Sequence, residues 1–80
     1  MKLAELPLGE PAVIDAVEEG SPVAQRLLDL GFVPGTAVRA LRRAPLGDPT
    51  LYELRGTRLC LRRSEAARVD VRLAGPRQPR

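Results

Sequence analysis

The sequence predicts a mainly β fold: a small, closed or nearly closed barrel of about five strands with one inserted α-helix. Five short segments alternate apolar and polar residues, a period of two that is typical of half-buried antiparallel strands. Between residues 21 and 31 the apolar residues are instead three and four apart, which indicates a helix. A chain of 80 residues has room for one domain, which we place at residues 1–74.

The strands are expected at residues 12–17, 37–43, 51–55, 58–62 and 68–73. Only Asp15 interrupts the apolar run of the first strand. Gly56-Thr57 predicts a tight hairpin between the third and fourth strands. Residues 64–67 fit one helical turn before the fifth strand. Short strands joined in this way favour closure into a barrel, which also leaves no exposed sheet edge.

The helix is expected to follow the first strand and to be about ten residues long. Ser21 can accept a hydrogen bond from the first turn, and Pro22 fits the first helical position. Gly31 can adopt the left-handed conformation that ends a helix. Residues spaced by four and three share its apolar face: Val23, Leu27 and Leu30. A helix this short needs packing against the sheet to be stable.

Residues 75–80 are polar and rich in proline, so we expect them to form a disordered tail. The amino-terminal residues lack the apolar stretch of a signal peptide, and no segment is long and apolar enough to span a membrane. The lone cysteine, Cys60, cannot form a disulfide within the chain, which favours the reducing cytosol.

Catalytic and metal-binding residue patterns are missing. The chain has no histidine, which is the commonest general base and a common metal ligand. A single cysteine cannot build a zinc site, and the acidic residues are scattered. Cys60 is expected to be a partly covered apolar side chain. We therefore predict no enzyme activity, no catalytic residue, no metal site and no cofactor.

Charge is distributed unevenly along the chain. Residues 1–38 hold two basic and six acidic residues, a net charge of −4, whereas residues 39–80 hold eleven arginines and four acids, a net charge of +7. The arginines could bind nucleic acid or an anionic surface, or could simply cover the solvent face of the strands. Nucleic acid is the less favoured partner, because Phe32 and Tyr52 offer little for bases to stack on. The arginines in question are Arg39, Arg42, Arg43, Arg55, Arg58, Arg62, Arg63 and Arg72.

Three segments resemble the FeoA-type ferrous iron transport proteins in order and spacing: residues 26–36 (RLLDLGFVPGT), 43–49 (RAPLGDP) and 55–66 (RGTRLCLRRSEA). A strand with Val69 and Val71 follows, and the resemblance covers about residues 3–73. It implies an SH3-like barrel with a helical insertion. It also implies a cytosolic accessory protein of the ferrous iron transporter, whose membrane subunit carries a GTP-binding domain. Such a protein acts by protein contact, and neither catalysis nor iron binding is firmly assigned to the family.

The leading hypothesis is therefore that this domain docks onto the cytosolic part of that transporter. The loop at residues 44–49 holds two prolines and presents Leu46 either at an exposed tip or folded back onto the barrel. A stiff, exposed apolar residue loses little entropy on docking. The expected partner-binding residues are Leu28, Leu30, Pro34, Pro45, Leu46 and Asp48. Nucleic-acid binding through the arginines and self-association as a homo-oligomer are the alternatives.

Overall fold

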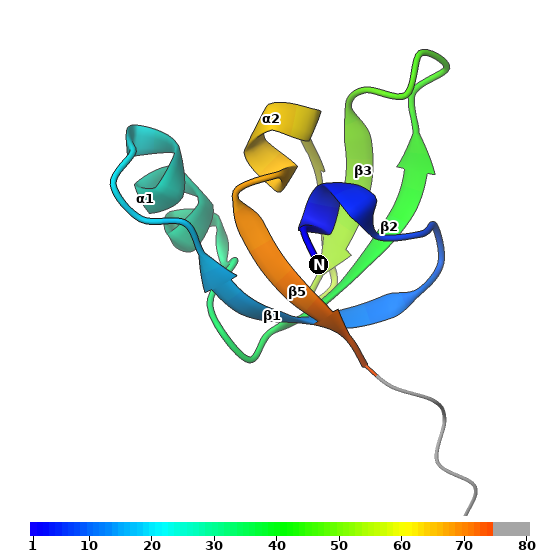
Figure 1. Ribbon diagram of the computed structural model, residues 1–80. Helices are drawn as coiled ribbons and strands as arrows, with labels where there is room; N and C mark the ends of the chain where they lie inside the picture. Colours follow the sequence, from blue (N-terminus) through cyan, green and yellow to red (C-terminus); the bar gives the residue numbers. More distant parts are fainter. Residues whose placement is uncertain (75–80) are drawn as a thin grey trace, which may run out of the picture.

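Five antiparallel strands form one sheet in a computed structural model that describes residues 1–74 (Figure 1). The strands are β1 (Pro11–Val17), β2 (Ala37–Arg43), β3 (Thr50–Leu54), β4 (Thr57–Leu61) and β5 (Val69–Leu73). Helix α1 (Pro22–Leu30) is inserted between β1 and β2, and the single turn α2 (Arg63–Ala66) joins β4 to β5. A short 3-10 helix, η1 (Leu3–Glu5), precedes β1. The mainly β class is confirmed. The tail expected at residues 75–80 lies outside the described residues.

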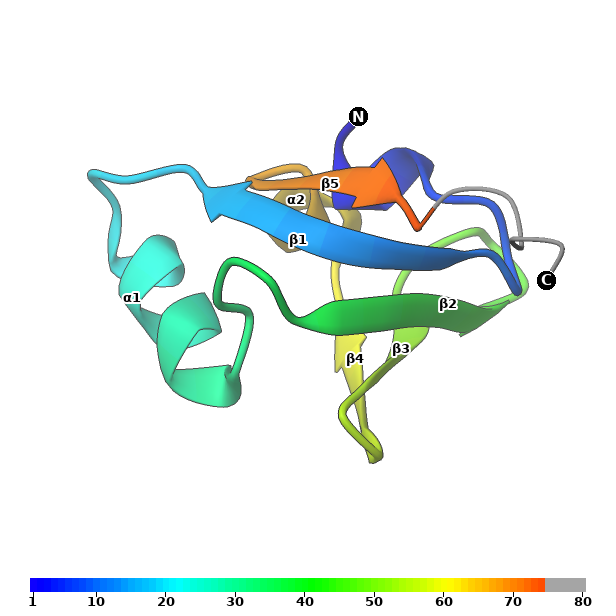
Figure 2. The same ribbon diagram turned by 90° about the horizontal axis from the view of Figure 1, so that it is seen from below.

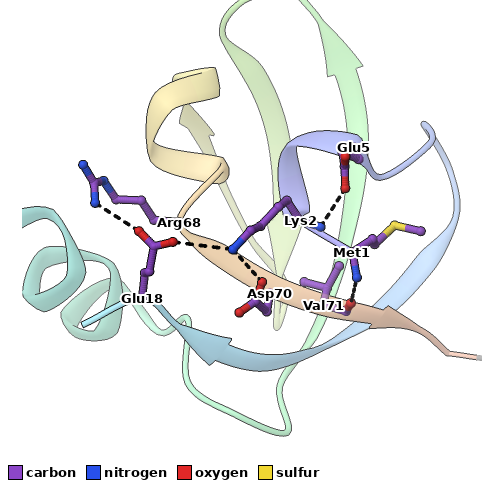
Figure 3. Close-up of polar contacts among 7 residues, drawn as sticks. All are labelled: Met1, Lys2, Glu5, Glu18, Arg68, Asp70 and Val71. Atoms are coloured by element: carbon purple, nitrogen blue, oxygen red, sulfur yellow. Dashed lines mark hydrogen bonds and ion pairs between the residues drawn. The ribbon is translucent and has the colours of Figure 1, made fainter. Parts of the chain in front are cut away.

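The sheet is curved but is not closed, so of the two expected forms, a closed and a nearly closed barrel, full closure is excluded. The strand order is β4-β3-β2-β1-β5, and within residues 1–74 β4 and β5 do not pair. The reason lies at the edge of β5, which the amino-terminal residues occupy. The Val71 N–H donates to the Met1 carbonyl oxygen at 2.8 Å, and the Met1 amino group donates to the Val71 carbonyl oxygen at 2.9 Å (Figure 3). Lys2 continues this pairing as a bridge to Asp70.

The core lies on the inner face of the sheet and is completed by η1. Leu3 and Leu6 are both 0% exposed, although the sequence pattern did not mark this segment as structured. Helix η1 contacts both α2 and β5, and Figure 1 shows η1 beside α2. The other buried apolar residues are Ala12, Ile14, Val17, Ala24, Leu27, Phe32, Val38, Ala40, Tyr52, Leu54, Leu61, Ala66, Val69 and Val71.

Helix α1 begins and ends where the sequence predicted. The Ser21 Oγ accepts a hydrogen bond from the Ala24 N–H at 3.2 Å, and Gly31 ends the helix with a φ of 113°. The expected apolar face is only partly buried, because α1 sits at the end of β1 instead of lying across the sheet (Figure 2). Leu27 is in the core, whereas Leu30 is 43% exposed.

The β3–β4 hairpin turns one residue earlier than predicted. Leu54 and Thr57 are paired, so the two turn residues are Arg55 and Gly56. Both have positive φ, 54° and 83° respectively, as a two-residue type I′ turn requires.

Candidate functional site

The loop between β2 and β3 is a tight, internally bonded turn. Across its base, the Ala44 N–H donates to the Pro49 carbonyl oxygen at 3.0 Å, and the Gly47 N–H donates to the Ala44 carbonyl oxygen at 2.7 Å. Pro45 occupies the second position of the latter turn, where its fixed φ is favourable. Leu46 is 95% exposed. Of the two arrangements considered for Leu46, the structure has the exposed tip.

Asp48 connects this loop to α2. Its Oδ1 accepts a hydrogen bond from the Arg63 N–H at 2.9 Å, and its peptide bond to Pro49 is cis. The carboxylate is thus positioned by the first residue of α2, although the side chain remains exposed. This bond links the loop that presents Leu46 to the start of α2.

A groove of about 480 Å³ lies at the base of the loop. The strand register places Arg42, Leu51 and Cys60 in one row across β2, β3 and β4. These three share the outer face of the sheet because residues paired across strands point to the same side, and the bulge between Ala40 and Arg42 moves Arg42 out of the inward row of Ala40. Cys60 is exposed, so the expectation that it is partly covered was wrong. The residues that line the groove are Arg42, Arg43, Ala44, Pro45, Pro49, Leu51 and Cys60.

A second exposed apolar patch follows α1. Leu30 and Val33 are 43% and 37% exposed, and Pro34 beside them is exposed as well. Leu28, in contrast, is half-buried and packs against the core. We call Leu30, Val33 and Pro34 the α1-end patch. Val33 did not stand out in the sequence, since an apolar residue after a helix-ending glycine ordinarily packs inward.

The six expected partner-binding residues do not form one surface. Helix α1 and the β2–β3 loop lie at opposite ends of the molecule in both ribbon views (Figures 1 and 2). The structure therefore separates the loop residues from the α1-end patch. A partner of ordinary size could contact one of these surfaces without reaching the other.

The arginines divide into two groups. Arg26, Arg68 and Arg72 each form an ion pair, with Glu65, Glu18 and Asp15 respectively. Seven others have no acidic partner within 4.0 Å among residues 1–74: Arg39, Arg42, Arg43, Arg55, Arg58, Arg62 and Arg63. All seven lie on β2, β3–β4 or the start of α2.

Within this second group, Arg39, Arg42 and Arg58 share the outer face of the sheet and form a positive surface there. Arg43 is partly held in place, because its guanidinium donates to the Leu6 carbonyl oxygen at 2.9 Å. Glu53 lies between Arg39 and Arg58 in the strand register without approaching either closely enough for an ion pair. The surface is therefore suited to a partner that carries negative charge.

Both aromatic side chains are in the core. Phe32 is 0% exposed and Tyr52 is 1% exposed, so neither can stack on a base. Proteins that grip single-stranded nucleic acid normally combine positive charge with such stacking platforms. The positive surface supplies the charge for nucleic-acid binding but has no aromatic side chain on which a base could stack.

Among residues 1–74, no three His, Cys, Asp or Glu side chains come together as a group that could hold a metal ion. No helix in this part of the chain is both long and apolar enough to cross a membrane.

Comparison with known proteins gives the family. The family model of the FeoA domain matches residues 1–73. The chain belongs to the FeoA family. This FeoA domain is 40% identical, over 73 residues, to a fusion of Fe(2+) transport protein A with the Fe(2+) transporter FeoB from Porphyromonas gingivalis. The match covers 91% of the chain but only 9% of the fusion protein.

Solved FeoA structures share the fold. The zinc-complexed FeoA of Stenotrophomonas maltophilia, an SH3-domain protein, has a TM-score of 0.81 at 43% identity, over 90% of this chain and 89% of that one. The FeoA protein of Chlorobium tepidum has a TM-score of 0.86 at 40% identity, over 98% and 74% of the two chains. The fold is therefore SH3-like, and the family is associated with ferrous iron transport.

Proposed function

We propose that this domain is an accessory of ferrous iron transport that acts by contact with the cytosolic part of a FeoB-type transporter. The observation that supports the proposal most strongly is the Porphyromonas gingivalis fusion, in which a homologous domain and the transporter share one polypeptide. A covalent link holds two modules at high effective concentration, which favours contact between them. On this proposal the domain works in the cytoplasm, at the inner face of the membrane.

We assign the contact to the tip of the β2–β3 loop. Leu46 is the most exposed large apolar side chain among the described residues. The loop is restrained by two backbone hydrogen bonds and by the bond from the Arg63 N–H to Asp48. Docking a pre-ordered loop loses little conformational entropy, so most of the free energy of burying Leu46 would be retained as affinity. Full burial of a leucine side chain contributes about 2 kcal/mol.

The test is the affinity of the purified domain for the cytosolic region of the transporter, measured by isothermal titration calorimetry. We expect Leu46→Asp to weaken binding by about tenfold or more, because it removes apolar contact and introduces a charge at the interface. Leu73→Asp is the matched control: it makes the same substitution at an exposed leucine on β5, away from the loop. Its affinity should equal that of the unmodified domain.

Equal affinity for Leu46→Asp and the unmodified domain, with both folded, would show that the loop is not the contact. Absence of any binding by the unmodified domain would remove the proposed partner itself. Both proteins should be checked first by their amide NMR spectra, so that a loss of fold is not mistaken for a loss of contact.

A further inference from the structure

The two edges of the sheet differ. Residues Met1 and Lys2 cover the edge of β5 through backbone hydrogen bonds and a bridge to Asp70 (Figure 3). At the other edge, β4 pairs with β3 on one side, and no strand of residues 1–74 pairs with its other side. An uncovered edge presents backbone N–H and C=O groups that can pair with another extended chain.

The hairpin geometry identifies which backbone groups of β4 face outward. The turn at Arg55 and Gly56 makes Leu54 and Thr57 the hydrogen-bonded pair that closes it. Hydrogen-bonded and non-hydrogen-bonded pairs then alternate along an antiparallel ladder. Arg58 and Cys60 consequently direct their N–H and C=O groups away from β3. This gives two donors and two acceptors, spaced as in a strand.

The open edge ends at Arg62. The Arg62 N–H donates to Glu65 Oε1 at 2.9 Å, and its carbonyl oxygen accepts from the Glu65 and Ala66 N–H groups, both at 2.9 Å. These bonds begin α2 and leave no edge groups beyond β4. The edge therefore has room for a short strand of about four or five residues.

The charged residues on and beside β4 indicate which kind of side chain such a strand would carry. Arg58 and Arg62 are exposed on either side of Cys60, and Arg55 precedes them in the turn. None of the three has an acidic partner within 4.0 Å among the described residues. Opposite charges on neighbouring strands stabilise pairing, and like charges directly opposite destabilise it.

We infer that β4 accepts an extended, acidic segment of a protein partner as a sixth strand. The inference rests on the proposed function, since it names the chemistry of the segment that a protein partner would present. A second copy of this chain fits poorly. Antiparallel pairing through the outward groups would place Arg58 opposite Cys60 of the other copy, and the Arg58 side chains of the two copies would then lie diagonal to each other as like charges. Nucleic acid could satisfy the arginines, but it has no backbone amides that match the edge groups.

The experiment uses fluorescence anisotropy with a labelled, capped six-residue peptide of alternating glutamate and valine. The domain should bind it, and a peptide with lysine in place of glutamate should not bind measurably. A third peptide, with every backbone amide N-methylated, keeps the charge but has no donor on either edge to pair with β4, so it should also fail to bind. Equal binding of the N-methylated peptide would overturn the inference, because the attraction would then be electrostatic only.

Variants of the domain locate the site. Arg58→Glu should weaken binding of the acidic peptide by about tenfold, because it replaces attraction by repulsion at the edge. Arg39→Glu is the matched control: it makes the same change in net charge on the same face, two strands away on β2. We expect it to weaken binding by about twofold at most, since exposed charges at that separation are largely screened. Equal losses in the two variants would overturn the inference.

Cys60→Pro tests the backbone pairing itself. Proline is accepted on an edge strand where the N–H faces solvent, so the fold should persist, and its amide NMR spectrum checks this. Because the variant removes one of the two outward donors, peptide binding should fall while the charge of the domain is unchanged. If Cys60→Pro is folded and binds as the unmodified domain does, pairing along β4 is excluded.

The same assay separates this inference from the proposed function. If the acidic peptide binds along β4 but the transporter's cytosolic region neither binds nor competes, the strand site stands and the proposed partner is wrong. If the transporter region binds and the peptide does not, the proposed function stands and the strand site is wrong. Binding of a single-stranded oligonucleotide, lost in Arg58→Glu, without binding of the peptide would also overturn the inference.

Discussion

Tyr52 is the residue whose protonation is most closely linked to the fold. Its side chain is 1% exposed, and its hydroxyl donates to the Leu3 carbonyl oxygen at 3.4 Å, which connects β3 to η1. Burial raises the pKa of Tyr52 above its ordinary value of 10.0, because the phenolate would lose its hydration. The native state therefore favours the neutral phenol.

This shift predicts a loss of stability in alkaline solution. Below about pH 10 the phenol is neutral in both states and its contribution to the free energy of unfolding is complete. As the pH rises further, the unfolded state loses the proton first, so the free energy of unfolding falls until the folded-state pKa is passed. Urea denaturation between about pH 8 and about pH 11 should show this decline, with a smaller decline in Tyr52→Phe.

Lys2 also affects the free energy of unfolding in alkaline solution, so its effect must be separated from that of Tyr52. The pKa of Lys2 is raised mainly by its hydrogen bond to Asp70, at 2.9 Å (Figure 3). The stabilisation from a raised lysine pKa is likewise present at neutral pH and lost as the pH rises through that pKa. Because Tyr52→Phe retains Lys2, the difference between the two proteins isolates the tyrosine. Identical pH profiles would contradict the assignment.

The elements of this fold follow closely from local sequence patterns. The predicted strand limits agree with β1 to β5 to within one residue, because alternation of apolar and polar residues directly reflects which face is buried. The limits of α1 were predictable from Ser21 and Gly31, since caps are local chemistry. The hairpin was displaced by one residue because positive φ at Arg55 is uncommon for a residue other than glycine.

The end of α1 offers a test of how closely this helix end approaches β3. A Cβ added at Gly31 would lie 3.1 Å from Leu54 Cδ2, whereas one added at Gly35 would meet nothing within 4 Å. Both glycines have positive φ, 113° and 91° respectively. We expect Gly35→Ala to lower the free energy of unfolding by about 1 kcal/mol through backbone strain alone.

Gly31→Ala should cost about 2 kcal/mol or more, because the same strain is joined by crowding between the helix end and β3. Urea denaturation of the two variants under identical conditions measures the difference. If the two alanines destabilise the domain equally, Leu54 moves aside without cost and crowding at the helix end adds nothing to the backbone strain.

The features that could not be predicted from the sequence are contacts between segments that are far apart in the chain. Closure failed because Met1 and Lys2 pair with β5, a contact between residues that are about seventy positions apart in the chain. Helix η1 was missed because Leu3 and Leu6 are too few to form a recognisable period, although both are fully buried. Each of these depends on how distant segments meet, which local patterns do not encode.

The candidate site was likewise predictable only where it depends on local sequence. The loop could be anticipated from prolines and a glycine between two strands, whereas the sequence left open whether Leu46 is exposed at its tip or folded back onto the sheet. The groove could not, since Arg42, Leu51 and Cys60 meet only through the register of three strands. Nor could the open edge of β4, which exists because the sheet does not close. Both surfaces lie on the β2–β4 half of the molecule, where the arginines lack acidic partners.

The most direct measurement of the central claim, that this domain works by protein contact on its β2–β4 half, is an NMR titration. The ¹⁵N-labelled domain would be titrated with the unlabelled cytosolic region of the transporter. We expect amide shifts or line broadening concentrated at residues 44–49 and 57–61, with β1, β5 and the α1-end patch unaffected. Changes confined to the α1-end patch, or an unchanged spectrum at saturating concentration, would contradict the claim.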